Sequence, residues 1–193
     1  MDIVQNTIHT ILGNGLEGWS GDGGPALEAA CQTPYACEFD PQGNMFVCMG
    51  RHHRIRRMDV RTGGISLVSG TGDAGYAGDG APALDATINQ PYGLAVDVNG
   101  DIYFAQRIDP AVRKIDSRSG IISTVAGTGE FGYSGDSGLG SEAMLREPND
   151  LYLDGQGGLL IADIQDQRIR RVDLDTGVIT TFAGTGEKSR DGD

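Results

Sequence analysis

The sequence predicts an all-β fold made of repeated four-stranded units, and three regularities predict it. A Gly-x-Gly motif follows an apolar, β-branched run at Gly13, Gly70, Gly127 and Gly184, always with the same spacing between successive copies. Such a fixed period without slippage is the signature of a repeat architecture. Glycine makes up 31 of the 193 residues, which suits many short strands joined by tight turns. The same step relates Pro34, Pro91 and Pro148; Asp40, Asp97 and Asp154; and Asp59, Asp116 and Asp173.

The second copy of the repeat shows the strand pattern of one unit. Residues 92–97 and 102–105 are two apolar runs separated by Val-Asn-Gly-Asp, and Asn-Gly is a strong signal for a hairpin turn. A third run at residues 112–116 turns through Ser-Arg-Ser-Gly into a fourth at 121–126. Four short antiparallel strands joined by turns are typical of a blade of a β-propeller.

The period places complete blades at residues 34–70, 91–127 and 148–184. Residues 8–12, Ile-His-Thr-Ile-Leu, match the fourth strand of each blade. We therefore expect them to form an orphan outer strand whose three partner strands are absent.

A long glycine-rich connection precedes each blade and carries an aromatic residue followed by Gly-Asp. Such a motif predicts an ordered loop with unusual backbone angles. Residues 25–30 are expected to form one helical turn with proline at its first position. Asp22, Asp79 and Asp136 are expected to cap their own loops by accepting backbone N–H bonds, rather than to bind Ca²⁺.

Three segments resemble NHL repeats. They are Leu-Ala-Val-Asp-x-x-Gly-x-Ile-Tyr-Phe-Ala at 94–105 with Val-Arg-Lys-Ile-Asp at 112–116, Ile-Ala-Asp-x-x-Asp-x-Arg-Ile-Arg-Arg-Val-Asp at 161–173, and Arg-Ile-Arg-Arg-Met-Asp at 54–59. The inserted loop resembles the long-loop bacterial form of the repeat. The resemblance implies a propeller, typically of six blades, and implies little about function, because propellers host many activities.

Three blades are too few to close a ring, since propellers usually contain four to eight. The last residues, Asp-Gly-Asp at 191–193, align with the middle of the Gly-Asp loop at 134–136. We expect half of a six-bladed protein, and the competing interpretation is a homodimer of two half-rings. The extra strand at residues 8–12 counts against the homodimer.

Composition excludes some classes of partner. The formal net charge of −12 argues against nucleic acid, which requires a basic face. The arginine clusters at 54–57 and 168–171 are expected to form cross-strand pairs with neighbouring acids. No stretch is long and apolar enough to span a membrane, and residues 1–6 do not resemble a signal peptide. We expect a cytoplasmic protein if Met1 is the native start.

Cysteine occurs only in the first repeat. Cys31, Cys37 and Cys48 stand where the other repeats carry apolar residues, so we expect buried thiols that pack as small hydrophobes. Cys37 and Cys48 lie opposite each other only if Asp40 faces Met45 across the intervening turn, and no disulfide is predicted.

Ligand binding is expected on the face that carries the long loops and the turns between second and third strands. These turns, at residues 49–53, 106–110 and 163–167, are the most divergent part of the repeat. Two adjacent histidines in the first turn raise the alternative of a metal ligand or proton carrier, although neighbouring side chains tend to point apart. The candidate binding residues are His52, His53, Arg107, Asp109 and Asp166.

A second candidate site would hold Ca²⁺. Pro-Asn-Asp at residues 148–150 resembles a segment of the calcium-dependent gluconolactonase-like propellers, in which the asparagine lines the channel and helps to bind the metal. The resemblance implies Asn149, Asp150, Asp163 and Glu38 as ligands, all of the oxygen type that Ca²⁺ prefers. The structural alternative is that Asn149 supports a turn and Asp163 is an ordinary residue of the repeat.

The sequence thus favours a binding or scaffold module for a protein or small-molecule ligand, since the repeat is regular and shows no catalytic set of residues. The alternative is a metal-dependent gluconolactonase-like hydrolase or lyase with its site at the central channel.

Overall fold

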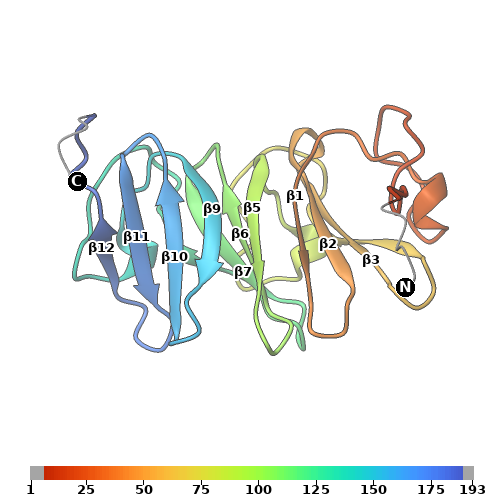
Figure 1. Cartoon of the computed structure of the whole chain (residues 1–193). Helices are drawn as coiled ribbons and strands as arrows, with labels where there is room; N and C mark the ends of the chain where they lie inside the picture. Colours follow the sequence, from red (N-terminus) through yellow and green to blue (C-terminus); the bar gives the residue numbers. More distant parts are fainter. Residues whose placement is uncertain (1–6, 189–193) are drawn as a thin grey trace.

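The computed structural model describes residues 7–188, which form three four-stranded antiparallel sheets (Figure 1). In each sheet the strands are hydrogen-bonded in chain order, so each sheet is one blade. The predicted all-β fold of propeller blades is therefore confirmed. Blade 1 contains β1 (Pro34–Phe39), β2 (Met45–Met49), β3 (Arg54–Met58) and β4 (Ile65–Ser69); blade 2 contains β5 (Pro91–Val96), β6 (Ile102–Gln106), β7 (Ala111–Ile115) and β8 (Ile122–Ala126); blade 3 contains β9 (Pro148–Leu153), β10 (Gly158–Asp163), β11 (Arg168–Asp173) and β12 (Ile179–Ala183).

The blades stand side by side, with the first strand of each blade next to that of its neighbour (Figure 1). Apolar side chains on the facing surfaces of adjacent blades form the core. Ile55 and Phe104 belong to the cluster between blades 1 and 2, and Val112 and Ile161 to the cluster between blades 2 and 3. Each blade therefore depends on a neighbour to bury its face, as in other repeat proteins.

The orphan outer strand expected at residues 8–12 does not form. A β-ladder requires a partner strand, and among residues 7–188 no strand pairs with this segment. Only Leu12 of this segment packs against the core, whereas the side chain of Ile8 is 98% exposed.

A short 3₁₀ turn lies in each connection: η1 (Ala26–Glu28), η3 (Ala83–Asp85) and η4 (Gly140–Glu142). The helical turn expected at 25–30 is therefore present in shorter form, with Pro25 just before it. Where two blades meet, this turn is inserted between them. The Gly70 N–H donates to the Ala83 carbonyl at 3.1 Å, and the Thr71 N–H to the Ala86 carbonyl at 3.0 Å.

The loop before each blade also pairs with the outer strand of that blade. The Gly23 N–H donates to the Ile65 carbonyl at 2.8 Å, and the Ile65 N–H donates to the Gly24 carbonyl at 3.0 Å. Equivalent bonds tie residues 80–81 to Ile122 and residues 137–138 to Ile179. The loop is thus an ordered border of its blade, as its sequence predicts.

An arginine on the third strand of each blade is completely buried and binds an aspartate of the preceding loop. Arg56, Arg113 and Arg170 have no exposed surface. Arg56 Nε lies 2.9 Å from Asp22 Oδ1, Arg113 Nη2 2.6 Å from Asp79 Oδ1, and Arg170 Nη2 2.7 Å from Asp136 Oδ1.

This ion pair corrects two expectations. The prediction that each aspartate caps its own loop was wrong, because its main partner is a guanidinium 34 residues further along the chain. The prediction of cross-strand pairs was wrong for Arg56 and Arg170. A buried guanidinium needs acceptors for its N–H groups, and in both cases the preceding loop supplies them instead of a neighbouring strand.

The remaining bonds of the Arg113 guanidinium go to the loop backbone and to a side chain of the neighbouring strand β6. Arg113 also donates to Gln106 Oε1 at 3.3 Å and to the Ala77 carbonyl at 3.4 Å, and its Cζ lies 5.0 Å from the centre of the Tyr76 ring. Burial raises the pKa of Asp136, but hydrogen bonds from Thr181, Tyr133 and Arg170 outweigh this effect and leave it below the usual 3.8.

The three cysteines are free, and their environments differ. Cys48 is buried, which raises the pKa of its thiol, and Cys31 is half-buried. The expectation of a buried thiol was wrong for Cys37, which is exposed. Phe39, rather than Asp40, faces Met45, so Cys37 lies opposite Val47 instead of Cys48.

We predict that Arg113→Lys destabilises the protein by about 2 kcal/mol, since acceptors around the buried guanidinium lose their hydrogen-bond donors. A single ammonium group cannot reach Asp79, Gln106 and the Ala77 carbonyl together. Urea unfolding followed by circular dichroism measures the change as a lower midpoint with an unchanged slope.

The matched control is Arg118→Lys, because Arg118 is exposed on the turn between β7 and β8. It should leave the midpoint unchanged within about 0.5 kcal/mol. Equal midpoints for the two variants would show that the additional hydrogen bonds of the Arg113 guanidinium do not stabilise the blade.

Candidate functional site

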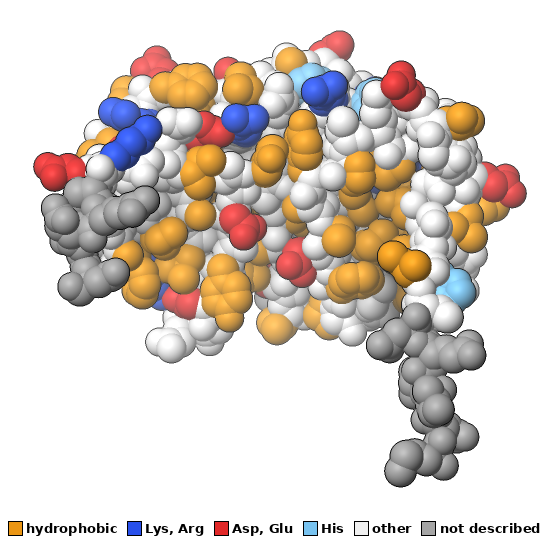
Figure 2. Space-filling model, turned by 45° about the horizontal axis from the view of Figure 1, so that its top comes forward, with side chains coloured by type: hydrophobic (Ala, Val, Ile, Leu, Met, Phe, Trp, Pro, Cys, Tyr) orange, Lys and Arg blue, Asp and Glu red, His pale blue; other side chains and the backbone are white. Residues whose placement is uncertain are grey.

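The turns between second and third strands lie at one end of the blades, together with the ends of the long loops (Figure 1). We call this surface the loop rim. It consists of residues 50–53, 107–110 and 164–167 with the residues before each first strand, 32–33, 89–90 and 146–147. Figure 2 shows blue, pale-blue and red side chains along the upper edge of the molecule. The rim is where ionisable side chains gather.

Each rim turn contains one non-glycine residue in the left-handed region. These residues are His53, Asp109 and Gln167, with φ of 51°, 54° and 56°. In blade 2 the position of His53 and Gln167 is taken by Pro110, whose ring fixes φ at about −65°. The left-handed residue is therefore Asp109, one position earlier, and the turn presents its side chains differently from those of the other blades.

The two histidines of blade 1 face different neighbours. His52 Nε2 lies 3.0 Å from Gln32 Oε1, and His53 Nδ1 accepts the Gln90 N–H of blade 2 at 3.2 Å. Burial lowers the pKa of both imidazoles below the usual 6.5, and the positive charge of Arg54 lowers both further. The lowered pKa favours the uncharged form of both rings, and His53 links two blades.

Arg107 lies between blades 2 and 3. Its Nε is 2.5 Å from Oε1 of the buried Glu147, and its Cζ lies 5.7 Å from the centre of the Tyr92 ring. Asp109 Oδ2 accepts the side-chain N–H of Asn89 at 3.0 Å. Both candidate residues are partly exposed, so they remain available to a ligand.

The carboxylates of blade 3 point into the protein. The two carboxylate oxygens of Asp163, which is completely buried, accept the backbone N–H groups of Glu147 at 2.7 Å and Arg146 at 2.9 Å. Burial raises the pKa of Asp163 above the usual 3.8, although these bonds partly oppose the effect. Asp166 is also buried and lies 2.7 Å from Arg168 Nη1. Asp166 thus lies in a rim turn, but its carboxylate is buried and paired with Arg168.

Two aromatic rings stack at the start of the first strands, a feature that the sequence analysis missed. Tyr35 and Tyr92 occupy the same repeat position, and their ring centres are 4.4 Å apart. A Cβ on Gly50 would lie 1.9 Å from the Tyr35 ring, so only glycine fits there. Asn149 holds the equivalent position in blade 3. The sequence signal for this stack is a pair of tyrosines one repeat apart, on the first strands of adjacent blades.

The residues proposed for a Ca²⁺ site do not assemble within residues 7–188. Glu38 and Asp150 are exposed on the first strands of blades 1 and 3, with β5 of blade 2 between those strands. Asp150 Oδ1 accepts the N–H of Leu151, and Asn149 is half-buried. In the described part of the chain, no group of three or more His, Cys, Asp or Glu side chains is arranged to hold a metal.

The exposed charges of the rim are mainly arginines, although the whole chain is acidic. Arg51 is exposed, and the side chains of Arg107 and Arg146 are 40% and 53% exposed. Ile108 and Ile164 are exposed beside them. The rim therefore combines guanidinium groups with apolar side chains.

Residues 62–133 match the family model of the teneurin NHL domain. The blades are NHL-type repeats. Human NHL repeat-containing protein 2 is 26% identical over 216 residues, which cover 97% of this chain and 30% of that protein. Mouse teneurin-3 is 37% identical over 110 residues, which cover 50% of this chain and 4% of that protein. The chain thus spans less than a third of either relative.

Among solved structures, virginiamycin B lyase from Staphylococcus aureus is similar, with a TM-score of 0.54 and 21% identity. The match covers 83% of this chain and 45% of that one. At this identity the likeness shows the propeller fold alone. Within residues 7–188, no helix has the length and apolar character needed to cross a bilayer.

We predict that stability falls as the pH is lowered through 6.5. The folded-state pKa of His53 lies below the usual 6.5, so the unfolded chain binds more protons in this range and becomes favoured. His53→Asn should reduce the loss between pH 7.5 and 5.5, since asparagine tolerates the left-handed conformation and does not titrate. Thermal unfolding of both proteins across this pH range measures the effect.

His9→Asn is the matched control, because His9 lies on the exposed segment before the first loop. It should keep the wild-type loss of stability. If His53→Asn also kept the whole loss, the link between His53 and blade 2 would not be the pH-sensitive contact.

Proposed function

We propose that this chain is a binding module whose loop rim holds a protein segment or a small molecule. The observation that carries the proposal is a contrast within the repeat. The pairs between a buried arginine and a loop aspartate recur in every blade, whereas the rim turns differ in sequence, in backbone and in charge. A constant scaffold with variable loops is the usual arrangement of binding sites.

The chemistry of the rim favours a ligand that carries carboxylates. Arg51, Arg107 and Arg146 expose guanidinium groups, which bind carboxylates in a planar, two-pronged geometry. Ile108 and Ile164 offer apolar contacts beside them. An acidic peptide with interspersed apolar side chains fits both features, as does a small carboxylate with an apolar body.

The alternative function, a Ca²⁺-dependent hydrolase or lyase, has less support. Its proposed ligand Asp163 already accepts two backbone N–H groups, and Glu38 lies two blades away from it. The likeness to virginiamycin B lyase concerns the fold alone. Self-pairing of the chain through its open blade faces is a separate proposal that does not depend on the rim.

We predict that the protein binds a fluorescein-labelled peptide of alternating glutamate and leucine, and that binding weakens as salt is raised. Arg51→Ala and Arg107→Ala should each lower the affinity at least about fivefold, as expected when one charged contact is lost. Fluorescence anisotropy measures the affinities.

Arg118→Ala, at the opposite end of the blades, is the control and should leave the affinity unchanged. Equal weakening by all three substitutions would show diffuse attraction rather than a site on the rim. Absence of binding at low salt would contradict the proposed ligand chemistry.

We predict that millimolar CaCl₂ leaves the melting temperature unchanged relative to EGTA, because a ligand of the folded state must raise its stability. Differential scanning calorimetry measures this. A rise with CaCl₂ that Asn149→Ala abolishes would favour the hydrolase or lyase instead.

A further inference from the structure

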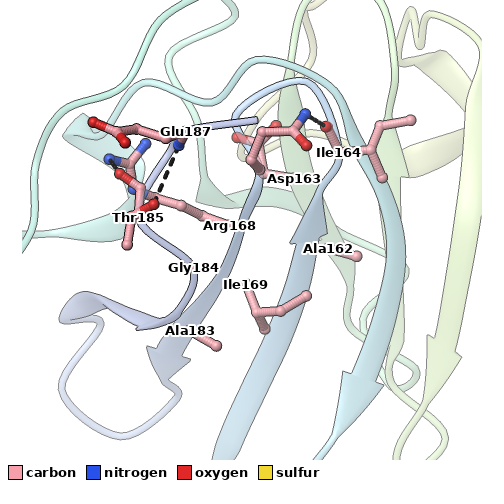
Figure 3. Close-up of a pocket in the computed structure, with 10 residues that line it drawn as sticks. Ala162, Asp163, Ile164, Arg168, Ile169, Ala183, Gly184, Thr185 and Glu187 are labelled. Atoms are coloured by element: carbon pink, nitrogen blue, oxygen red, sulfur yellow. Dashed lines mark hydrogen bonds between the residues drawn. The ribbon is translucent and has the colours of Figure 1, made fainter. Parts of the chain in front are cut away.

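Blade 3 presents an open apolar face that has no neighbour within residues 7–188. A pocket of about 690 Å³ lies on it, lined by residues that include Ala162, Ile169, Ala183 and Gly184 (Figure 3). Figure 3 shows these residues at the upper part of β10, β11 and β12 and the chain just beyond. Beside the pocket, Tyr152 and Phe182 are 66% and 64% exposed. We call this pocket the socket.

The same socket is filled in the two other blades. The residues equivalent to Ala183 and Gly184 are Ser69 and Gly70 in blade 1, and both are buried there. They are covered by the 3₁₀ turn of the next loop and the residues after it, which we call the plug. The plugs are residues 26–31, 83–88 and 140–145, one in each repeat.

Plug and socket meet through a fixed set of contacts. At the first junction the N–H groups of Gly70 and Thr71 donate to the carbonyls of Ala83 and Ala86, and Ile88 is completely buried. At the second junction the Gly127 N–H donates to the Gly140 carbonyl at 2.9 Å, and Ala143 and Leu145 are buried in turn. The socket of blade 3 therefore has a known type of occupant.

The first plug is the complement of this socket, because within residues 7–188 no blade precedes it. Its carbonyls at Ala26 and Ala29 accept the N–H groups of Gly13 and Asn14, at 2.9 and 3.0 Å. By the repeat, Gly13 and Asn14 are the equivalents of Gly184 and Thr185. The exposed segment before Gly13 contributes only Leu12 to the core, and a groove of about 610 Å³ lies between it and Leu27 and Cys31.

We propose that two copies of the chain pair head to tail, with the first plug of each copy seated in the blade 3 socket of the other. The N–H groups of Gly184 and Thr185 then replace those of Gly13 and Asn14 on the same two carbonyls. This replacement of donors conserves the number of hydrogen bonds. The pairing also covers the apolar side chains of Tyr152 and Phe182, whose exposure lowers the solubility of the single chain.

Residues 8–12 no longer count against such pairing. As an orphan strand they would have had no place in a ring of two copies, but they form no strand and are largely exposed, so little is lost when they are displaced. Residues 7–188 contain three blades, and closed propellers have four to eight, so two copies of this stretch are the number that forms a closed ring. Each copy supplies one socket and one plug, so a two-fold ring leaves neither open.

Size-exclusion chromatography with light scattering on the full chain tests the proposal. The expected mass is twice the monomer mass of 20.3 kDa. Ala183→Arg should weaken the dimer at least about 100-fold, because the substitution places a charge in the centre of the interface. Ala183 is exposed in the single chain, so the variant should still fold, which circular dichroism checks.

Val98→Arg is the control, since Val98 is exposed on a turn remote from the socket, and it should leave the dimer intact. Amide hydrogen–deuterium exchange tests whether the plug changes partners. In the dimer the N–H groups of Gly13 and Asn14 should lose protection, and those of Gly184 and Thr185 should gain it. A monomer at high concentration, or a dimer that survives Ala183→Arg, overturns the pairing. A dimer with Gly13 and Asn14 still protected overturns this change of partners.

Discussion

The ion pair between a buried third-strand arginine and a loop aspartate is the interaction on which each repeat depends. A guanidinium removed from water must find acceptors for its N–H groups, because leaving the charge unpaired costs several kcal/mol. In each blade the loop supplies the Asp carboxylate and backbone carbonyls such as those of Ser20 and Ala30, which Arg56 reaches at 3.2 and 2.8 Å. In blade 2, Gln106 of β6 is a further acceptor. The loop must therefore be folded for the blade to be stable.

This requirement explains how a glycine-rich connection of some twenty residues keeps a single conformation. Gly21 has φ of +100°, and a Cβ at this position would lie 2.7 Å from the Cα of Ala29. The equivalent glycines, Gly78 and Gly135, show the same two constraints. The turn can thus approach the plug closely while its aspartate reaches the guanidinium. A flexible composition and a fixed shape are compatible because the glycines permit one unusual path and the arginine selects it.

The period of the sequence was sufficient to predict the blades, since a repeated pattern reports local strands and turns. It could not reveal the partner of Arg56, because Asp22 is 34 residues away and a Gly-Asp-Gly segment also suits a self-capping turn. Residues 8–12 have the composition of a strand, but a strand requires a ladder partner. Cys37 was misjudged because one residue of turn register decides which side chains face each other.

The candidate site was predictable to a smaller extent. The divergent turns located the rim, and Arg107 and Asp109 are accessible there. The burial of Asp163 and Asp166 could not be predicted from the sequence. An aspartate in a polar turn has the same sequence signature whether it faces solvent or backbone amides. The Tyr35–Tyr92 stack could have been predicted from the sequence, since the repeat places both rings on adjacent inner strands.

The loop before a blade pairs with the outer strand and the buried arginine of that same blade, so these contacts of blade 1 all lie within the stretch from Gly13 to Ser69. A boundary drawn at the start of the first strand would cut through it, whereas one at Gly70 or Gly127 crosses mainly the contacts between plug and socket. Loop plus blade is therefore the segment that gene duplication can copy, or that a protein engineer can add or delete, without leaving a buried charge behind.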